Sequence, residues 1–449
     1  MKLPKINIPK NFEDNKDRNY THFCILPLQL VGAWDWYPKP VSEWQIIVNY
    51  TYLGLVLIFL IDTLVMLLVN VCTDWVDPMS GLEKLADGLP YVASLFMVSY
   101  FACYKRDLYD MHEFMNRRFK YHSAWGLTNM NMGNSYKAAK LFCYAYTMSS
   151  LSSSWMYALA PLLTYLWTNL PPQNWFYMDI THFPYIELTF LRQFMAQTFM
   201  GLALGQLGVF YASHSILICG QLDLLCCSLR NARFTALLKD GVQHGALKGY
   251  AEELKNLQKH NFLYNEAVHE DSLYNYNEKI NKRFKQGRAT YDIYSSEFDA
   301  STEEALRECA ELSRMLAHYK QTFQTFASPL LVVRVVQVTL FLCILLYSAS
   351  RKLNMVTVEY LMAVAFDIFI YCYYGNQIII QASRVSTSAY ESWWETSGVR
   401  ARRLLLHILL ANKRPMVVRA AFCLPMNIAT YRAIIKTSFS YYTLLANVN

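Results

Sequence analysis

Seven long apolar stretches run through the 449-residue chain, and they restrict its fold more than any other feature. A helix needs about 20 mostly apolar residues to cross about 30 Å of hydrocarbon. Inside lipid, only helices and closed barrels satisfy all of their own backbone hydrogen bonds. We therefore predict an all-α membrane protein with seven transmembrane helices. The predicted spans are residues 45–71, 86–104, 138–167, 192–221, 328–350, 357–380 and 420–449.

Lysine and arginine indicate the orientation, because loops rich in these residues stay on the cytoplasmic side. Of the 41 basic residues, 34 lie in four segments of one face, namely 1–43, 105–140, 228–327 and 381–419. Only three lie in the loops of the other face, which are 72–85, 168–191 and 351–356. This predicts a cytoplasmic N-terminus and an extracellular C-terminus. The topology also accounts for the net charge of +7 without nucleic acid as a partner.

The orientation separates the chain from G-protein-coupled receptors, which have seven helices but an extracellular N-terminus. The segment after the third span, TNLPPQNWFYMDITHFPYIELT, contains no lysine or arginine and no Asp-Arg-Tyr-like motif. The seventh span has no Asn-Pro-x-x-Tyr motif near its end. A transporter, the second alternative, would show paired Gly- or Pro-interrupted segments in its two halves, and the sequence has no such pairing.

The polar insert at 228–327 carries fourteen basic and fourteen acidic residues. Its stretches AEELKNLQKHNFLYNEAVHE and STEEALRECAELSRMLAHYK have apolar residues at helical spacing, which predicts cytoplasmic extensions of the fourth and fifth spans that pack on each other. Between them, NEKINKRFKQGRATYDIYSSEFDAS is typical of a flexible loop. The run LLLHILL predicts a further helix of a cytoplasmic helical anchor.

These features predict six regions along the chain. They are a cytoplasmic N-terminal segment at 1–44, a bundle of spans one to four at 45–227, the helical insert at 228–327, spans five and six at 328–380, an anchor helix region at 381–419, and the seventh span at 420–449.

Sequence motifs of catalysis are not found. The sequence has no Gly-x-x-x-x-Gly-Lys-Ser/Thr, no His-Glu-x-x-His and no Gly-x-Ser-x-Gly. The ten histidines and eleven cysteines are scattered, so neither a metal site nor a secreted-type disulfide framework is expected. We therefore expect no enzyme activity and no cofactor.

A binding site for a small molecule is better supported by the sequence than a catalytic or metal site. Apolar and aromatic side chains with a few polar groups gather in the outer halves of spans two, three, four and six, as an apolar pocket requires. The candidate ligand-binding residues are Tyr91, Leu95, Met148, Leu151, Trp155, Leu159, Met195, Phe199, Tyr360 and Val364. Taken singly, each of these is better explained as a packing residue of the core than as a ligand contact. The pair Gly201 and Gly205 would let the fourth span approach a neighbouring helix closely.

The last part of the chain contains sequence motifs that resemble those of a known receptor family. The stretches YCYYGNQIIIQASRVSTSAYESWW and PMNIATYRAIIKTSFSYYTLL, together with the predicted topology, resemble an insect odorant receptor. The residues that carry it are Gly375, Asn376, Ser383, Ala389, Tyr390, Trp393, Pro415 and the run Thr437 to Leu445. The terminal Ser-Tyr-x-Thr-Leu-Leu pattern resembles the ligand-tuning subunits of that family more than its co-receptor. A gustatory receptor, from the sister family, is the nearest alternative.

The resemblance implies an odorant-gated, non-selective cation channel of four subunits in the plasma membrane of a sensory neuron dendrite. The implied partners are a small volatile odorant, the co-receptor subunit and membrane lipid. The seventh helices would line one central pore, which explains why this span mixes hydroxyl and amide groups with apolar residues. The candidate pore and gate residues are Thr437, Ser440, Tyr441, Leu444, Asn447 and Val448. Among them, Leu444 and Val448 match the apolar pair that forms the gate in the family.

Overall fold

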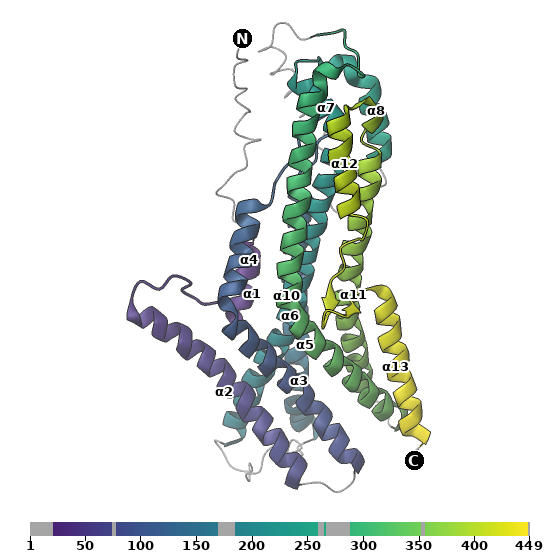
Figure 1. The fold of residues 1–449 in the computed structure, drawn as a ribbon. Coiled ribbons are helices and arrows are strands. Elements are labelled where there is room, and N and C mark those ends of the chain that lie inside the picture. The colour runs from purple at the N-terminus through teal and green to yellow at the C-terminus, as the bar shows by residue number, and fades with distance from the viewer. Residues whose placement is uncertain are drawn as a thin grey trace.

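A computed structural model gives the fold of residues 21–73, 78–168, 185–258, 265, 288–351 and 355–447. These residues are mostly helical. The long helices are α2 (Glu43–Thr73), α3 (Pro78–Cys103), α5 (Gly133–Thr168), α6 (Tyr185–Arg230), α10 (Asp299–Arg351), α11 (Met355–Tyr390) and α13 (Ile428–Asn447). The molecule is elongated, with α6, α10 and α11 running along its long axis and α2 and α3 tilted across it (Figure 1). Shorter helices are α1 (His22–Leu30), α4 (Lys105–Arg118), α7 (Ala232–Lys239), α8 (Lys248–Gln258) and α12 (Val399–Ala411), with 3-10 turns at His244–Leu247, Ser296–Phe298 and Trp394–Thr396.

Each of the seven predicted spans falls on one of the long helices. Among the described residues, five helical stretches are long and apolar enough to cross a membrane, lying on α2, α3, α6, α10 and α11. The predicted spans 138–167 and 420–449 lie on α5 and α13, which are less apolar. Serines at 149, 150 and 152–154 lower the hydropathy of α5, and the charged residues Arg432 and Lys436 lower that of α13. The seven-span topology therefore remains a prediction, while the helical, membrane-type architecture is established.

Three helices extend well beyond their predicted spans. Helix α6 runs from 185 to 230, α10 from 299 to 351 and α11 from 355 to 390. Their extra turns join α7, α8 and α12 in a helical base at one end of the molecule, far from the end of α13 (Figure 1). The predicted helical stretch at 301–320 is the first part of α10. The stretch at 251–270 is helical as far as Gln258, and most of its remainder lies outside the described residues.

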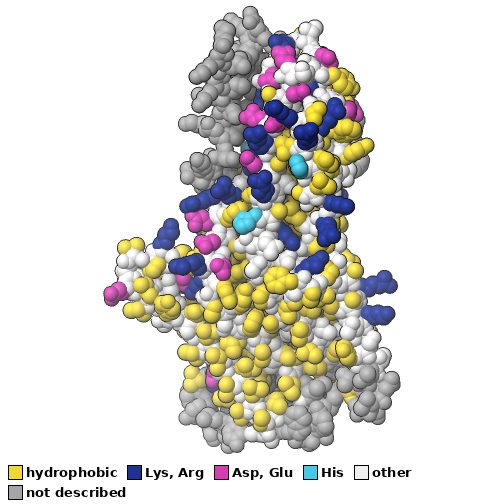
Figure 2. Space-filling model, in the orientation of Figure 1, with side chains coloured by type: hydrophobic (Ala, Val, Ile, Leu, Met, Phe, Trp, Pro, Cys, Tyr) yellow, Lys and Arg dark blue, Asp and Glu magenta, His cyan; other side chains and the backbone are white. Residues whose placement is uncertain are grey.

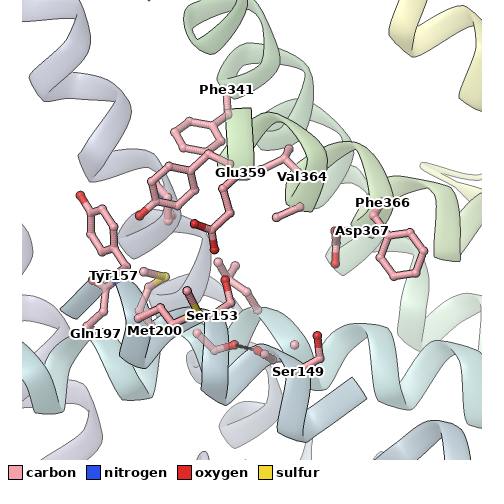
Figure 3. A pocket seen from close by; sticks show the side chains of 18 of the residues that line it. Ser149, Ser153, Tyr157, Gln197, Met200, Phe341, Glu359, Val364, Phe366 and Asp367 are labelled. Carbon is pink, nitrogen blue, oxygen red and sulfur yellow. Dashed lines mark hydrogen bonds between the residues drawn. The ribbon is translucent and has the colours of Figure 1, made fainter. Parts of the chain in front are cut away.

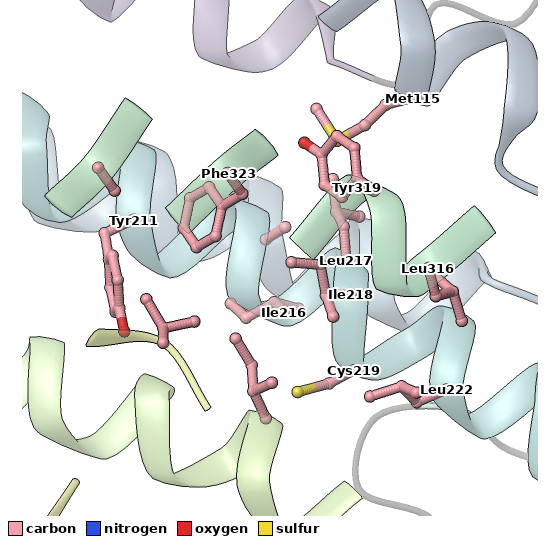
Figure 4. Packing of buried hydrophobic residues seen from close by; sticks show 14 of the residues in the cluster. Met115, Tyr211, Ile216, Leu217, Ile218, Cys219, Leu222, Leu316, Tyr319 and Phe323 are labelled. Atoms are coloured by element: carbon pink, nitrogen blue, oxygen red, sulfur yellow. The ribbon is translucent and has the colours of Figure 1, made fainter. Parts of the chain in front are cut away.

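Helix α6 is the centre of the fold, since every residue from Gly205 to Arg230 is buried. Its side chains interdigitate with those of α10 and α4, as Figure 4 shows for Ile218 and Leu222 of α6, Tyr319 of α10 and Met115 of α4. A helix that is buried on all sides needs neighbours all round, and this one packs against α2, α3, α5, α10 and α11. The core thus continues without a break from the base into the apolar half.

Buried arginines hold the base together. Arg233 of α7 is fully buried, and its guanidinium donates to the backbone carbonyls of Ile293 and Ser295 and lies 3.2 Å from the Asp299 carboxylate. Arg230 contacts Glu391 at 2.6 Å, just beyond the end of α11. Because a buried guanidinium needs its donors satisfied, these bonds fix α7 and the end of α6 against the start of α10 and the end of α11.

The seventh predicted span begins later than expected. Residues 419–425 form a hairpin of β1 (Arg419–Ala420) and β2 (Leu424–Pro425), in which Ala421 and Phe422 adopt positive φ angles of 49° and 59°. Residues with such φ angles cannot continue a right-handed helix. Asn427 then caps α13, because its side-chain oxygen accepts a hydrogen bond of 2.9 Å from the backbone N–H of Thr430. The prediction of helix at 420–427 was therefore wrong.

The surface divides along the same axis. Hydrophobic side chains cover the half that contains α2 and α3, whereas lysines, arginines and acidic side chains gather at its boundary and on the base (Figure 2). Helix α2 exposes many large apolar side chains, among them Ile58, Ile61 and Leu68. An apolar surface of this extent suits contact with lipid.

Candidate functional site

A cavity of about 620 Å³ lies among five helices of the apolar half, α3, α5, α6, α10 and α11. Figure 3 shows its wall, with Ser149 and Ser153 of α5 opposite Glu359 and Val364 of α11. Ligand sites for small molecules have volumes in this range and combine an apolar wall with a few polar groups. The cavity is therefore the best candidate for the predicted ligand site.

Close packing of α5 on α6 shapes one wall. The Ser150 hydroxyl donates a hydrogen bond of 2.7 Å to the carbonyl of Gly201. A Cβ atom at Gly201 would lie only 1.6 Å from the Ser154 hydroxyl oxygen, and one at Gly205 would lie 2.5 Å from that of Ser150. The two glycines thus allow the close approach that their spacing predicts, and serines of α5 line the cavity beside them.

The end of the cavity nearer the base holds a buried ion pair. Arg334 Nε of α10 lies 2.8 Å from Asp367 Oδ2 of α11, and both side chains are more than nine-tenths buried. Tyr146 of α5 donates a hydrogen bond of 2.7 Å to the other carboxylate oxygen, and Arg334 also donates to Gln337. This network joins three helices through charge-assisted hydrogen bonds, and its members line the cavity.

The end of the cavity farther from the base is aromatic and acidic. The rings of Tyr157 and Tyr360 meet edge to face with centroids 5.0 Å apart, and Phe341 lies 6.2 Å from Tyr360. Asp87 of α3 and Glu359 of α11 also line this region. In Figure 3 the Glu359 side chain projects from α11 into the open space. A ligand here would meet ring faces and carboxylate oxygens together.

Three of the ten residues predicted to bind ligand line the cavity, namely Tyr91, Tyr360 and Val364. Tyr91 is buried and donates a hydrogen bond of 2.7 Å to Gln197, another lining residue. The structure thus brings together these side chains from α3 and α11. Whether they contact a ligand remains a prediction.

The other seven predicted residues do not line the cavity. Leu95, Leu151, Met195 and Phe199 pack into a separate apolar cluster with α2, where Phe199 lies 5.9 Å from Phe59. Met148, Trp155 and Leu159 are exposed. They lie on a different face of α5 from Ser149, Ser153 and Met156, and Trp155 donates to Thr198 rather than facing the cavity.

Sequence reasoning missed the polar part of this wall. It selected apolar side chains, whereas the serines of α5 and the pair Arg334 and Asp367 line much of the cavity. The signal was present in the sequence, because charged residues within predicted spans usually face the interior of a bundle. Arg192 and Asp62 are partly exposed, but they lie 2.6 Å apart and so pair with each other, as charged residues within spans commonly do.

Helix α13 lies at the side of the bundle and contacts α10 and α11 along one face. Ile434 and Ser438 are buried there, whereas Thr437, Ser440 and Tyr441 are exposed. Leu444 and Asn447 belong to the last turn of α13, and Val448 lies outside the described residues. The predicted pore residues whose side chains the structure describes thus point away from their own bundle.

Proteins similar to this chain are found along most of its length. The profile of the family described as 7tm Odorant receptor matches residues 83–439. Odorant receptor 85e of Drosophila melanogaster is 25% identical over 425 residues, covering 91% of this chain and 87% of that protein. Odorant receptor 83a of the same species is 22% identical over 392 residues, covering 84% of each.

Among solved structures, the insect olfactory receptor OR5 from Machilis hrabei in complex with eugenol has the same fold. It aligns with a TM-score of 0.69 at 15% identity, covering 96% of this chain and 100% of that one. A second structure of the same receptor aligns with the same TM-score, at 16% identity.

Proposed function

The chain belongs to the 7tm odorant receptor family of insects, and from this premise we propose that it is the ligand-tuning subunit of an odorant-gated, non-selective cation channel. A small volatile molecule binds in the cavity among α3, α5, α6, α10 and α11. The α13 helices of four subunits, including the co-receptor, line the pore in the plasma membrane.

One observation carries the proposal: two of the helices that wall the cavity are also the two that hold α13. Helix α10 lines the cavity with Arg334 and Phe341, and the nearby Cys343 thiol donates to the carbonyl of Ser438 on α13. Helix α11 lines it with Asp367, and its Phe369 ring lies 5.4 Å from that of Tyr431 on α13. A ligand that shifts α10 or α11 therefore acts directly on α13.

The open face of α13 supports its role in a pore. Thr437, Ser440 and Thr443 are exposed on it, and hydroxyl groups suit a helix that meets water on one side and neighbouring subunits on the other. The exposed Arg432 and Lys436 lie toward the start of the helix, and we assign them to the inner headgroup region, away from the gate.

We infer the orientation from the distribution of charge. The basic residues at the boundary of the apolar half and on the base (Figure 2) favour a cytoplasmic base. The end of α13 then lies on the extracellular side, and the cavity opens within the outer part of the membrane.

Ligand-evoked current tests the proposal. Cells that express the chain with an insect odorant receptor co-receptor should give cation currents with at least one member of a volatile panel. These currents should persist when G-protein signalling is blocked, because the receptor itself forms part of the pore. Loss of current under G-protein block would contradict the channel mechanism. A full response without the co-receptor would contradict the assignment as a tuning subunit.

A further inference from the structure

The ionisable carboxyl and guanidinium groups that line the cavity are unevenly distributed. Three are acidic, Asp87, Glu359 and Asp367, and one is basic, Arg334. Arg334 and Asp367 neutralise each other in the buried pair at the end nearer the base. Asp87 and Glu359 belong to the other end, since each lies in the half of its helix that is farther from the base. The end of the cavity away from the base is therefore acidic.

Glu359 is the carboxylate best placed to meet a ligand. Its side chain extends into the open space of the cavity (Figure 3), and within the part of the chain that the structure describes it makes no ion pair or hydrogen bond. A neutral apolar ligand would displace water from this carboxylate without forming a hydrogen bond in its place, which costs free energy. A ligand with a cationic hydrogen-bond donor would replace that water with a charge-assisted bond.

The neighbouring rings favour the same kind of ligand. Tyr157, Tyr360 and Phe341 form one aromatic group, with successive centroids 5.0 Å and 6.2 Å apart. The face of an aromatic ring attracts a cation through its quadrupole. Beyond the rings, Met200 and Val364 offer an apolar wall for the rest of the molecule.

We propose that the preferred ligands of this receptor are small amines, which bind in the protonated form with the ammonium group on Glu359 and the carbon skeleton against Phe341, Met200 and Val364. This inference rests on the proposed function and specifies its ligand class. Asp87 adds negative potential at the same end of the cavity, and the Arg334–Asp367 pair lines the opposite end.

A matched pair of probes tests the proposal. 2-Phenylethylamine and 2-phenylethanol have nearly the same shape, but an alkyl amine with a pKa near that of lysine is protonated at pH 7 and the alcohol is neutral. In cells that express the full chain with the co-receptor, the amine should evoke half-maximal current at a concentration at least about tenfold lower, the effect of one favourable charged contact.

Variants at Glu359 then identify the contact. Glu359→Gln keeps the shape and removes the charge, so it should weaken the response to the amine about tenfold or more without weakening the response to the alcohol. Glu359→Asp keeps the charge and should retain a measurable part of the amine preference. Glu252→Gln, at an exposed position of α8 in the base, is the control and should change neither response. Surface staining of each variant shows that the protein reaches the membrane.

The outcomes separate this proposal from the one on which it rests. Equal potency of the two probes, or an equal effect of Glu359→Gln on both, would overturn the amine assignment. Currents evoked by neutral volatiles but not by the amine would overturn it too, and would leave odorant gating intact. If no volatile evokes current at normal surface expression, the proposed function itself fails.

Discussion

At the residue scale, the pair of Arg334 and Asp367 is the most sensitive to mutation, because each charge is buried and depends on the other. Asp367→Asn leaves the guanidinium without its counter-ion, which costs about 3–5 kcal/mol of folding free energy. We expect a large fall in surface expression and in the melting temperature of the purified receptor. Replacing both partners, Arg334→Met with Asp367→Leu, should recover much of the loss.

The pair of Arg192 and Asp62 is the matched comparison, since its side chains are 30% and 35% exposed. Arg192 lies at the outer end of its predicted span, where its guanidinium can reach the headgroups when the partner is lost, so Asp62→Asn should cost less folding free energy than Asp367→Asn. If the two aspartate variants lose equal stability, burial does not explain the cost at Asp367.

His112 of α4 should make stability depend on pH. Burial lowers the pKa of His112 from 6.5 to about 4, and its ring lies 5.2 Å from that of His214 and 4.9 Å from that of Trp34. The folded protein therefore keeps His112 neutral while the unfolded chain binds a proton below about pH 6.5. The neutral His112 therefore costs no folding free energy above about pH 6.5. As the pH drops towards 4 the free energy of unfolding decreases, by about 2 kcal/mol at pH 5.

Thermal melting of the purified receptor between pH 7.5 and pH 5 measures this effect. His112→Gln should reduce the loss of melting temperature on acidification. His407→Gln on the exposed face of α12 should leave it unchanged. Equal slopes for the wild type and for His112→Gln would show that other groups account for the acid sensitivity.

At the scale of helices, the contact between α5 and α6 depends on the absence of side chains. The methyl group of Gly201→Ala would lie 1.6 Å from the Ser154 hydroxyl oxygen and 2.8 Å from its Cβ, so the helices must separate. We expect a loss of about 1–3 kcal/mol in the free energy of unfolding, as for other overpacked sites. Gly54→Ala on α2 is the control, because a Cβ there meets nothing within 4 Å. That variant should be neutral or slightly more stable in thermal melting, and a similar loss at both positions would contradict the packing argument.

The last turns of α13 carry the prediction about the gate. If Leu444 belongs to an apolar ring, Leu444→Ser should wet the constriction and raise the current in the absence of ligand. Leu445→Ser, about 100° around the helix, controls for general damage to α13. Current recordings that give the same leak for both variants would show that Leu444 has no special place in the pore. The co-receptor supplies other parts of the ring, so a partial leak is expected.

The sequence predicted these helices better than it predicted the cavity. Hydropathy located all seven long helices, because burial in lipid or in the core requires long apolar runs. It could not show that 420–427 contains a hairpin, since Ala421 and Phe422 are apolar residues with no turn signal of their own. It also could not show which side of α5 faces the cavity. Trp155 and Ser153 are close neighbours in the chain, and only the packing of α5 on α6 decides which of them points inward.

At the scale of the whole molecule, the topology predicts which ends are accessible. A tag on the N-terminus should be hidden from antibody on intact cells, and a tag after Asn449 should be stained. Permeabilised cells give the control, in which both tags should be stained. An N-terminal tag that is stained on intact cells would reverse the orientation and contradict a cytoplasmic base.

The continuity of α6, α10 and α11 has a consequence for how the length of such a sequence can change over evolution. Each helix passes without a break from the base into the apolar half, and α10 alone has 53 residues. Inserting or deleting one residue within such a helix rotates everything beyond it by about 100° and shifts it by about 1.5 Å. A change of that size would turn the cavity wall out of register with the base. Gains and losses of residues among related genes should therefore accumulate between these helices, where a change in length leaves their register intact.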